Sequence, residues 1–269
     1  MCLAAFALAA HPRFSLVIAA NRDEFFARPT APMAWWPSGG IELLAGRDLS
    51  AGGTWFGLTR AGRLALLTNV REPGRQLADA PSRGALVVDW LAGTQDAPAF
   101  AAGLRPGYNG FNLVTADLAR DRWHWLSNRS DRSDRPQALA PGLHALSNAA
   151  LDTPWPKTTG LKAAMAEALA RATSAERLAE DLFTALADRS PAPDEALPDT
   201  GVGLARERLL SPRFVRMPDP ARPGLAAYGT RCSTVLIRRA DGSTLAVERS
   251  VGADGRQQST VTHALPRWP

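Results

Sequence analysis

The chain begins MCLAAFALAAHPRFSLVIAANRDEFFARPT, residues 1–30, and the interpretation of the whole sequence starts from this stretch. Two apolar runs, residues 2–9 and 14–20, are joined by a short polar connection, which predicts a β-hairpin. The second run ends in a polar cluster, NRDE at residues 21–24, and a cysteine stands directly behind the initiator methionine. We therefore expect a hairpin with a reactive side chain near its start and charged groups at its end.

Composition limits the class of protein. With 269 residues, 45% apolar and 21% charged, the chain is an ordinary globular protein. No apolar run reaches the roughly 18 residues of a membrane span, so we expect none. Residues 3–10 resemble a short signal h-region, but they lack a basic region before them. The second apolar run at 14–20 favours the hairpin over a signal peptide.

The cysteines and the basic charge indicate a compartment and exclude one partner. Only Cys2 and Cys232 occur, which argues against a disulfide framework and predicts a cytoplasmic location. A net charge of +5 is typical of some nucleic-acid-binding proteins. However, 29 of the 31 basic residues are scattered arginines, a pattern better explained by codon bias. We expect no nucleic-acid partner.

Strand patterns occupy both ends of the chain and helix patterns the middle. Helices are predicted over 83–91, 97–104, 158–172 and 175–189, with caps at Ser82 and at Thr173, which has capping-box spacing to Glu176. Residues 25–54 and 190–203 are predicted loops, the first with a short strand at 41–45. Further strands are predicted over 54–59, 64–70, 111–116, 122–126, 143–147, 232–239, 244–249 and 257–262. This order predicts a single α+β domain, residues 1–269, whose two ends share a sheet.

Cys2 is the first candidate for chemistry. Initiator methionine is normally removed before a small residue, and the mature chain would then carry a thiol and a free α-amine on residue 2. An α-amine has a pKa near 8, so it can serve as the base that activates the thiol. A buried, inert strand cysteine is an equally valid interpretation from position alone.

The cluster at 21–24 gives the second set of candidates. In a strand, alternate side chains face alternate sides, so Asn21 and Asp23 point one way while Arg22 and Glu24 point the other. If the hairpin pairs as predicted, the cluster lies close to Cys2. A carboxylate there would hold the α-ammonium, and the arginine would hold a thiolate or a substrate carboxylate. The alternative is a solvated strand end with a weak surface ion pair.

Several asparagines follow predicted strands, namely Asn69, Asn109, Asn112 and Asn148. An amide presented from a strand end can donate a hydrogen bond to an oxyanion during acyl transfer. Asparagine also favours turns for reasons of its own backbone, which is the simpler explanation for any one of them. In the late segment YGTRCST, residues 228–234, Arg231 at a strand start can reach a pocket. Cys232 then faces the opposite side, and we interpret it as structural.

Together these segments identify a resemblance. The start MC, the NRDE cluster, GGTWFGLTRAGRLALLTNVREP, LSNAALDTPWPKT and YGTRCSTVL are similar to the NRDE family, also called the transport and Golgi organisation 2 family. The resemblance covers about residues 1–262. That family is more distantly similar to cysteine N-terminal nucleophile hydrolases such as penicillin V acylases and bile salt hydrolases. It implies a four-layer αββα sandwich and the hydrolysis of an amide or thioester (acyl) bond, which requires no cofactor.

The resemblance also implies roles for particular residues. Cys2 matches the nucleophile, and Asp23 matches the acid that orients the N-terminal amine. Asn69 and Asn148 match active-site asparagines, the first of them in the oxyanion hole. Arg231 matches a late arginine of those hydrolases.

One position departs from the hydrolase pattern. Those enzymes usually carry an arginine two residues before the asparagine of an Arg-Asn-x-Asp motif, and Ala20 stands there instead. Arg22, beside the acid, is the arginine that this chain offers at the site. Because of strand alternation, Arg22 and Asp23 are expected to face opposite sides of the sheet.

Two other classes of function compete with the enzyme. The resemblance implies that eukaryotic relatives are linked to haem movement, to lipid or acyl-CoA handling and to secretory organisation. A cleft lined by Trp35, Trp36, Trp55 and Phe56 would accept such a flat or greasy ligand. Haem would need an axial ligand from Cys2 or from the four histidines, which are His11, His124, His144 and His263. A purely structural partner protein is the third class, and no Cys/His spacing predicts a metal site.

Overall fold

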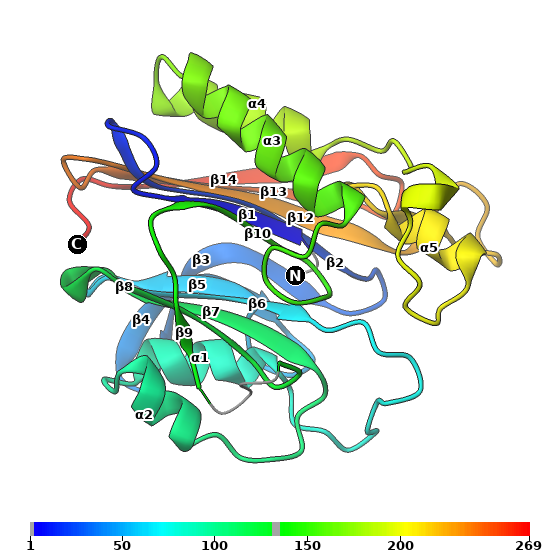
Figure 1. The fold of residues 1–269 in the computed structure, drawn as a ribbon, viewed down its shortest axis with the longest axis horizontal. Coiled ribbons are helices and arrows are strands. Elements are labelled where there is room, and N and C mark those ends of the chain that lie inside the picture. The colour runs from blue at the N-terminus through cyan, green and yellow to red at the C-terminus, as the bar shows by residue number, and fades with distance from the viewer. Residues whose placement is uncertain (1–2, 131–134) are drawn as a thin grey trace.

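The computed structural model describes residues 3–130 and 135–269, and it shows two stacked β-sheets between two layers of helices (Figure 1). The strands are β1 (Leu3–Leu8), β2 (Phe14–Phe25), β3 (Thr30–Ser38), β4 (Ile41–Asp48), β5 (Phe56–Thr59), β6 (Arg63–Asn69), β7 (Phe111–Asp117), β8 (Arg122–Ser127), β9 (Gln137–Ala138), β10 (Gly142–Leu146), β11 (Arg216–Pro218), β12 (Ala226–Arg239), β13 (Thr244–Val251) and β14 (Gln257–Leu265). The helices are α1 (Gly84–Ala92), α2 (Ala97–Ala102), α3 (Pro156–Arg171), α4 (Ala175–Leu186) and α5 (Leu204–Leu210). Short 3₁₀ turns lie at Leu118–Arg120 and Asp194–Ala196.

The first sheet unites the two ends of the chain, as predicted. Its order is β10-β1-β2-β12-β13-β14, with β11 paired to β12, and every pair is antiparallel. Strand β2 runs to Phe25, further than the predicted 14–20, because β12 pairs with it as far as Tyr228↔Phe25. The 21–24 cluster therefore belongs to a strand and has fixed neighbours on β12.

The second sheet has the order β3-β4-β5-β6-β7-β8-β9 and is also antiparallel. The loop predicted over 25–54 is wrong for residues 30–48, where β3 and β4 form a long hairpin through Gly39 and Gly40, both at positive φ. The short strand predicted at 41–45 is confirmed, because it lies within β4. Proline and tryptophan misled the prediction. β3 is the edge strand and its register shifts between Ala31 and Ala34, and edges and bulges are where a strand tolerates proline.

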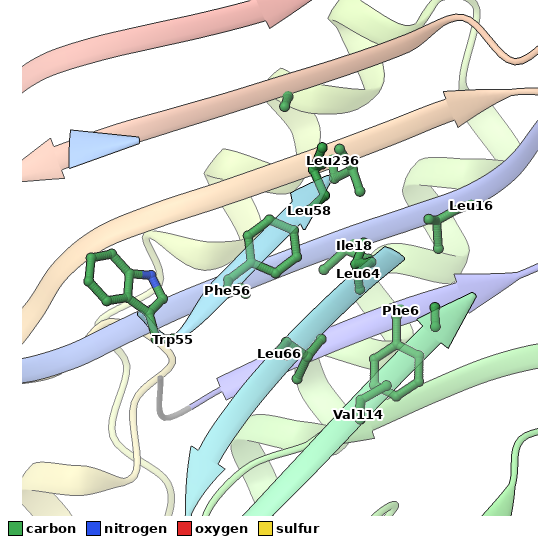
Figure 2. Packing of buried hydrophobic residues seen from close by; sticks show 14 of the residues in the cluster. Phe6, Leu16, Ile18, Trp55, Phe56, Leu58, Leu64, Leu66, Val114 and Leu236 are labelled. Carbon is green, nitrogen blue, oxygen red and sulfur yellow. The ribbon is translucent and has the colours of Figure 1, made fainter. Parts of the chain in front are cut away.

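The two sheets bury a common apolar core (Figure 2). Phe6, Ile18 and Leu236 come from the first sheet, and Phe56 and Leu66 from the second; all are at most 1% exposed. Side chains of this size contribute about 1.5–3 kcal/mol each when fully buried. This core supplies the contact between the two inner layers of the sandwich.

The outer layers are formed by helices packed on each sheet. α3 and α4 bury Leu161, Met165 and Leu182 against the first sheet, and α1 and α2 bury Trp90 and Phe100 against the second. The sandwich is therefore four-layered, α-β-β-α, as expected. None of the helices in the described residues is long and apolar enough to span a membrane.

Some helix boundaries differ from the predictions. Arg83 rather than Ser82 precedes α1 and makes no side-chain cap, because the first turn instead packs against the backbone at Thr54, whose N–H donates to the Gly84 carbonyl. Ser174, one residue after the predicted Thr173, caps α4 by accepting a hydrogen bond from the Arg177 N–H at 3.1 Å. α5 was not predicted, since its seven residues are too few to show a helical period.

Candidate active site

A cleft with two adjoining lobes lies where β2 and β6 end. The first lobe, about 640 Å³, is lined by polar residues of both charges, including Arg22, Glu24 and Asp48. The second lobe, about 320 Å³, is bordered by the start of α3, by α5 and by β11. Five residues line both lobes and mark their boundary: Asp23, Phe25, Asn69, Gln76 and Tyr228.

A separate pocket of about 430 Å³ lies at the opposite end of β6, where it is lined by Arg63 and Asp117. The Arg63 guanidinium is used there to hold the chain, since it donates to the carbonyl oxygens of Trp90 and Gln95. This pocket contains none of the predicted site residues. The cleft at the Asn69 end is therefore the candidate site.

Asp23 is held at the boundary by a defined hydrogen-bond relay. The Val215 N–H donates to the Thr230 hydroxyl at 3.0 Å, and that hydroxyl donates to Asp23 Oδ1 at 2.7 Å. Thr230 lies directly opposite Asp23 in the β2–β12 register. The carboxyl group is only 4% exposed, so its orientation is fixed by this relay.

Arg22 faces the space between the sheets, on the side opposite Asp23, as strand alternation predicts. Its guanidinium stacks over Trp55 at 4.2 Å from the ring centre and lies 3.8 Å from a Glu24 oxygen. Its Nη1 donates to the Thr30 hydroxyl at 3.1 Å. Because the strand ends at the cleft, Arg22 and Asp23 both border the first lobe despite their opposite directions.

Asn21 points to the helix layer and is structural. Its Nδ2 donates to the carbonyl oxygens of Leu186 and Arg213, and its Oδ1 accepts from the Ser233 hydroxyl at 2.6 Å. These bonds tie the end of α4 to the first sheet. Asn21 and Asp23 therefore share a side, as predicted.

The two predicted asparagines meet at the second lobe. Asn148 Nδ2 donates to the backbone oxygen of Asn69 at 2.9 Å, and both residues line the lobe. The Asn112 side chain donates to the backbone oxygen of Ala149, the residue after Asn148, at 2.8 Å. The Asn109 side chain instead forms two hydrogen bonds with the backbone of Leu77, which hold that loop in place.

Arg231 does not line either lobe. It is the extra residue of a bulge in β12, where the pairing jumps from Thr230 to Cys232. Its guanidinium donates to the carbonyl oxygens of Phe25 and Arg28, both at 2.9 Å. Arg231 thus holds the turn after β2. Strand alternation predicted that Arg231 and Cys232 face opposite sides, but the bulge interrupts that alternation.

Cys232 is buried in the core between the sheets, and burial raises the pKa of its thiol well above the ordinary value. Burial also raises the pKa of its neighbour Glu248, whose carboxyl accepts from the Met33 N–H at 2.7 Å. A protonated, inaccessible thiol is unreactive. This agrees with a structural role for Cys232.

Cys2 lies outside the described residues. Its covalent neighbour Leu3 is fully buried, and Leu3 pairs with Asn21, two residues before Asp23.

The expected aromatic cleft is wrong in most of its residues. Trp55 lines the first lobe, but Phe56 is buried in the core between the sheets. Trp35 packs against that core and under Arg60, and Trp36 packs against the α1–α2 layer. Alternation along β3 sends Trp35 and Trp36 to different layers, which a count of tryptophans cannot reveal.

The described lining of the two lobes contains no histidine or cysteine. Both ring nitrogens of His144 are engaged, by Asp152 at 2.8 Å and by the Ala140 oxygen at 3.0 Å. In the ranges 3–130 and 135–269, no group of three or more His, Cys, Asp or Glu side chains is arranged to hold a metal ion. The described part of the cleft thus offers neither histidine nor cysteine as an axial ligand to haem.

Sequence reasoning missed Thr230, Tyr228 and Lys157. Thr230 and Tyr228 lie in the late segment, where attention fell on Arg231. Lys157 lines the second lobe and is only 4% exposed. The sequence feature that could have identified Lys157 is the scarcity of lysine, because the chain has only one other, Lys162.

The described residues define an α+β protein of the four-layer αββα sandwich class, with a polar cleft where β2 and β6 end. The chain belongs to the Transport and Golgi organisation 2 family, whose family model matches residues 1–253. It is 37% identical over 263 residues to the Transport and Golgi organization protein 2 homolog of Bos taurus, covering 93% of this chain and 92% of that protein.

Two solved structures have a similar chain path. One is a Caenorhabditis elegans N-acylethanolamine-hydrolyzing acid amidase ortholog, with TM-score 0.48, 14% identity and coverage of 88% of this chain and 92% of the other. The other is the C2A mutant of conjugated bile acid hydrolase from Clostridium perfringens, with TM-score 0.48, 7% identity and coverage of 97% and 96%. These values are too low to say anything about activity.

Proposed function

We propose that this protein hydrolyses an amide or thioester bond of an acyl compound, with Cys2 as its nucleophile after removal of Met1. The observation that carries the proposal is the convergence of Asp23, Asn69 and Asn148 on one cleft, next to the strand pair that Leu3 opens. A buried carboxylate and two amides that line one lobe are the groups that such a reaction needs.

The roles follow from the chemistry of each group. The α-amine of Cys2 takes the thiol proton, and the sulfur attacks the carbonyl carbon. Asp23, held by Thr230, orients the resulting ammonium group. The Asn148 amide stabilises the oxyanion of the tetrahedral intermediate. The ammonium then protonates the leaving amine or thiol, and an acyl-enzyme thioester remains.

Water completes the reaction. The α-amine removes a proton from water, the hydroxide attacks the thioester carbon, and the carbon–sulfur bond breaks. The carboxylic acid leaves and Cys2 regains its proton. No cofactor takes part in this cycle.

The polarity of the lobes supports an orientation for the substrate. The second lobe has apolar walls from Phe25, Leu210 and Met217, which suit an acyl group. The first lobe carries charges of both signs, with Arg28 and Asp48 paired at 2.8 Å, which suits a polar leaving group. The scissile bond would lie between them, beside Asp23 and Asn69.

A comparison of wild type with Cys2→Ala tests the proposal. Both untagged proteins are incubated with a panel of N-acyl amides and acyl thioesters of graded chain length, and acid release is measured. We expect turnover by the wild type and by the control Cys232→Ala, and none by Cys2→Ala. Full activity in Cys2→Ala would contradict the proposal.

One observation favours binding of a lipid-like ligand without catalysis. Apolar side chains are exposed on elements that border the second lobe, with Phe25 at 58% and, on α5, Leu204 at 50% and Leu209 at 40%. An acyl-CoA or lipid ligand held without turnover by both wild type and Cys2→Ala, in equilibrium dialysis, would favour this function. Haem binding stays a prediction, and haemin titration without a Soret shift would contradict it.

A further inference from the structure

Lys157 is a buried cation at the candidate site that the proposed reaction does not use. It lies in the first turn of α3, directly after Pro156, and lines the second lobe together with Asp23, Asn69 and Asn148. Its side chain is 4% exposed, and its Nζ lies 3.5 Å from Asn148 Oδ1.

This is an unfavourable position for a lysine on two grounds. Burial removes the ammonium group from water, which disfavours the charged form. The N-terminus of a helix carries partial positive charge, so a cation in the first turn is repelled. Lys162, on the same helix, is by contrast exposed to solvent. Departures of this kind from local rules concentrate at functional sites.

The contact with Asn148 indicates what Lys157 does there. An asparagine amide has two N–H donors and one oxygen acceptor. One donor of Asn148 is engaged by the Asn69 backbone oxygen at 2.9 Å. The Lys157 ammonium at 3.5 Å and the Ser147 hydroxyl at 3.4 Å both donate to Oδ1. Together they fix which end of the amide faces the Asn69 carbonyl, and the second N–H is then the donor that a substrate can use.

We infer that Lys157 is a positioning residue for the Asn148 amide, an inference that rests on the proposed function. It holds the amide in the orientation that donates to the oxyanion. Its positive charge, close behind the amide, also favours negative charge developing on the substrate oxygen. The effect falls on kcat, since the oxyanion exists only in the transition state and intermediate.

The kinetic test uses both lysines of the chain. Lys157→Met keeps the length of the side chain and removes its charge, Lys157→Arg keeps the charge, and Lys162→Met is the matched control on the same helix. Active sites are counted by alkylation of Cys2, so that misfolded protein does not enter kcat. We expect kcat of Lys157→Met to fall about 10²-fold, the cost of a misplacement near 1 Å, with KM changed less than threefold.

Lys157→Arg should recover part of that loss, and Lys162→Met should match the wild type. An unchanged kcat per active site in Lys157→Met would overturn the inference while leaving the proposed function intact. Absence of any Cys2-dependent turnover in the wild type would overturn both.

A second measurement does not depend on turnover or on folding of the Lys157 variants. Protein labelled with ¹³C at lysine Cε gives only two side-chain signals, which can be titrated by NMR. Asn148→Asp places a carboxylate within reach of Lys157 and should raise the Lys157 pKa without moving that of Lys162. Equal titration of Lys157 in wild type and Asn148→Asp would show that the contact is absent and would overturn the inference.

Discussion

The two lobes of the cleft share one boundary but differ in chemistry. The first is about twice as large, and its charges are balanced within it, Arg28 with Asp48 and Arg22 with Glu24. The second has apolar walls and a buried ammonium group. This difference would orient a substrate in the cleft, because an apolar acyl group suits the second lobe and a polar leaving group suits the first.

The two lobes also differ in the role of their residues, some of which build the wall while others face the substrate. Residues of the first lobe are held by ion pairs and by stacking on Trp55, so most of them build the wall. Asp23 at the boundary and Asn148 in the second lobe are instead held through hydroxyl and amide hydrogen bonds. Substitutions on the two sides should therefore have unequal effects.

The largest expected effect is at Asp23, on the boundary. In Asp23→Asn the charge that orients the α-ammonium is lost while the shape is kept. We expect kcat/KM to fall about 10³-fold, because Asp23 orients the α-amine that acts as general base, and such catalysis contributes about 10²–10⁴-fold. Asp48→Asn, in the wall of the first lobe, is the control and should lose less than tenfold. Equal losses at the two positions, in steady-state assays, would remove the distinction between boundary and wall.

The next effect is at Asn148, in the second lobe. Asn148→Ala removes an oxyanion donor and should lower kcat about 10²-fold, as for other oxyanion-hole donors. Asn109→Ala removes an amide that borders the first lobe and only fastens Leu77, so its kcat should stay near that of the wild type. A larger fall in kcat for Asn109→Ala than for Asn148→Ala would contradict the placement of the oxyanion donor in the second lobe.

A smaller effect is expected at the apolar wall of the second lobe. Leu210→Asn should lower kcat/KM about tenfold for long acyl chains and leave acetyl substrates unaffected, because only long chains reach that wall. Leu209→Asn, its exposed neighbour, is the control. A loss that is independent of chain length would mean that the acyl group lies elsewhere.

The smallest effect concerns stability behind the first lobe, at Glu248. Burial raises its carboxyl pKa above the ordinary value of 4.5, so the folded state holds the proton more tightly than the unfolded chain. The stability that this contributes is present below pH 4.5 and is lost as the pH rises through the folded pKa. The glutamine in Glu248→Gln cannot ionise. The free energy of unfolding of this variant should therefore increase relative to that of the wild type as the pH rises above 4.5. Urea titrations from pH 4 to 8 measure this, and a constant difference would contradict it.

The strand patterns at both ends and the helix patterns in the middle predicted one α+β domain whose ends share a sheet, and the resemblance to the NRDE family implied its four layers. It did not reveal the β3–β4 hairpin, whose prolines are tolerated only because β3 is an edge strand with a bulge. Asp23, Asn69 and Asn148 were identified as strand-end polar residues and do meet at one cleft. Arg231 was expected there too, but a bulge redirects it, and a bulge has no signature in the residue types alone.

The central claim is that Cys2 becomes an N-terminal, reactive thiol beside this cleft. The most direct measurement is the intact mass of untagged protein before and after brief iodoacetamide treatment under native conditions. We expect a mass without Met1 and the addition of a single carbamidomethyl group, which peptide mapping assigns to Cys2 because Cys232 is buried. A retained methionine, or a Cys2 no more reactive than Cys232, would contradict the account.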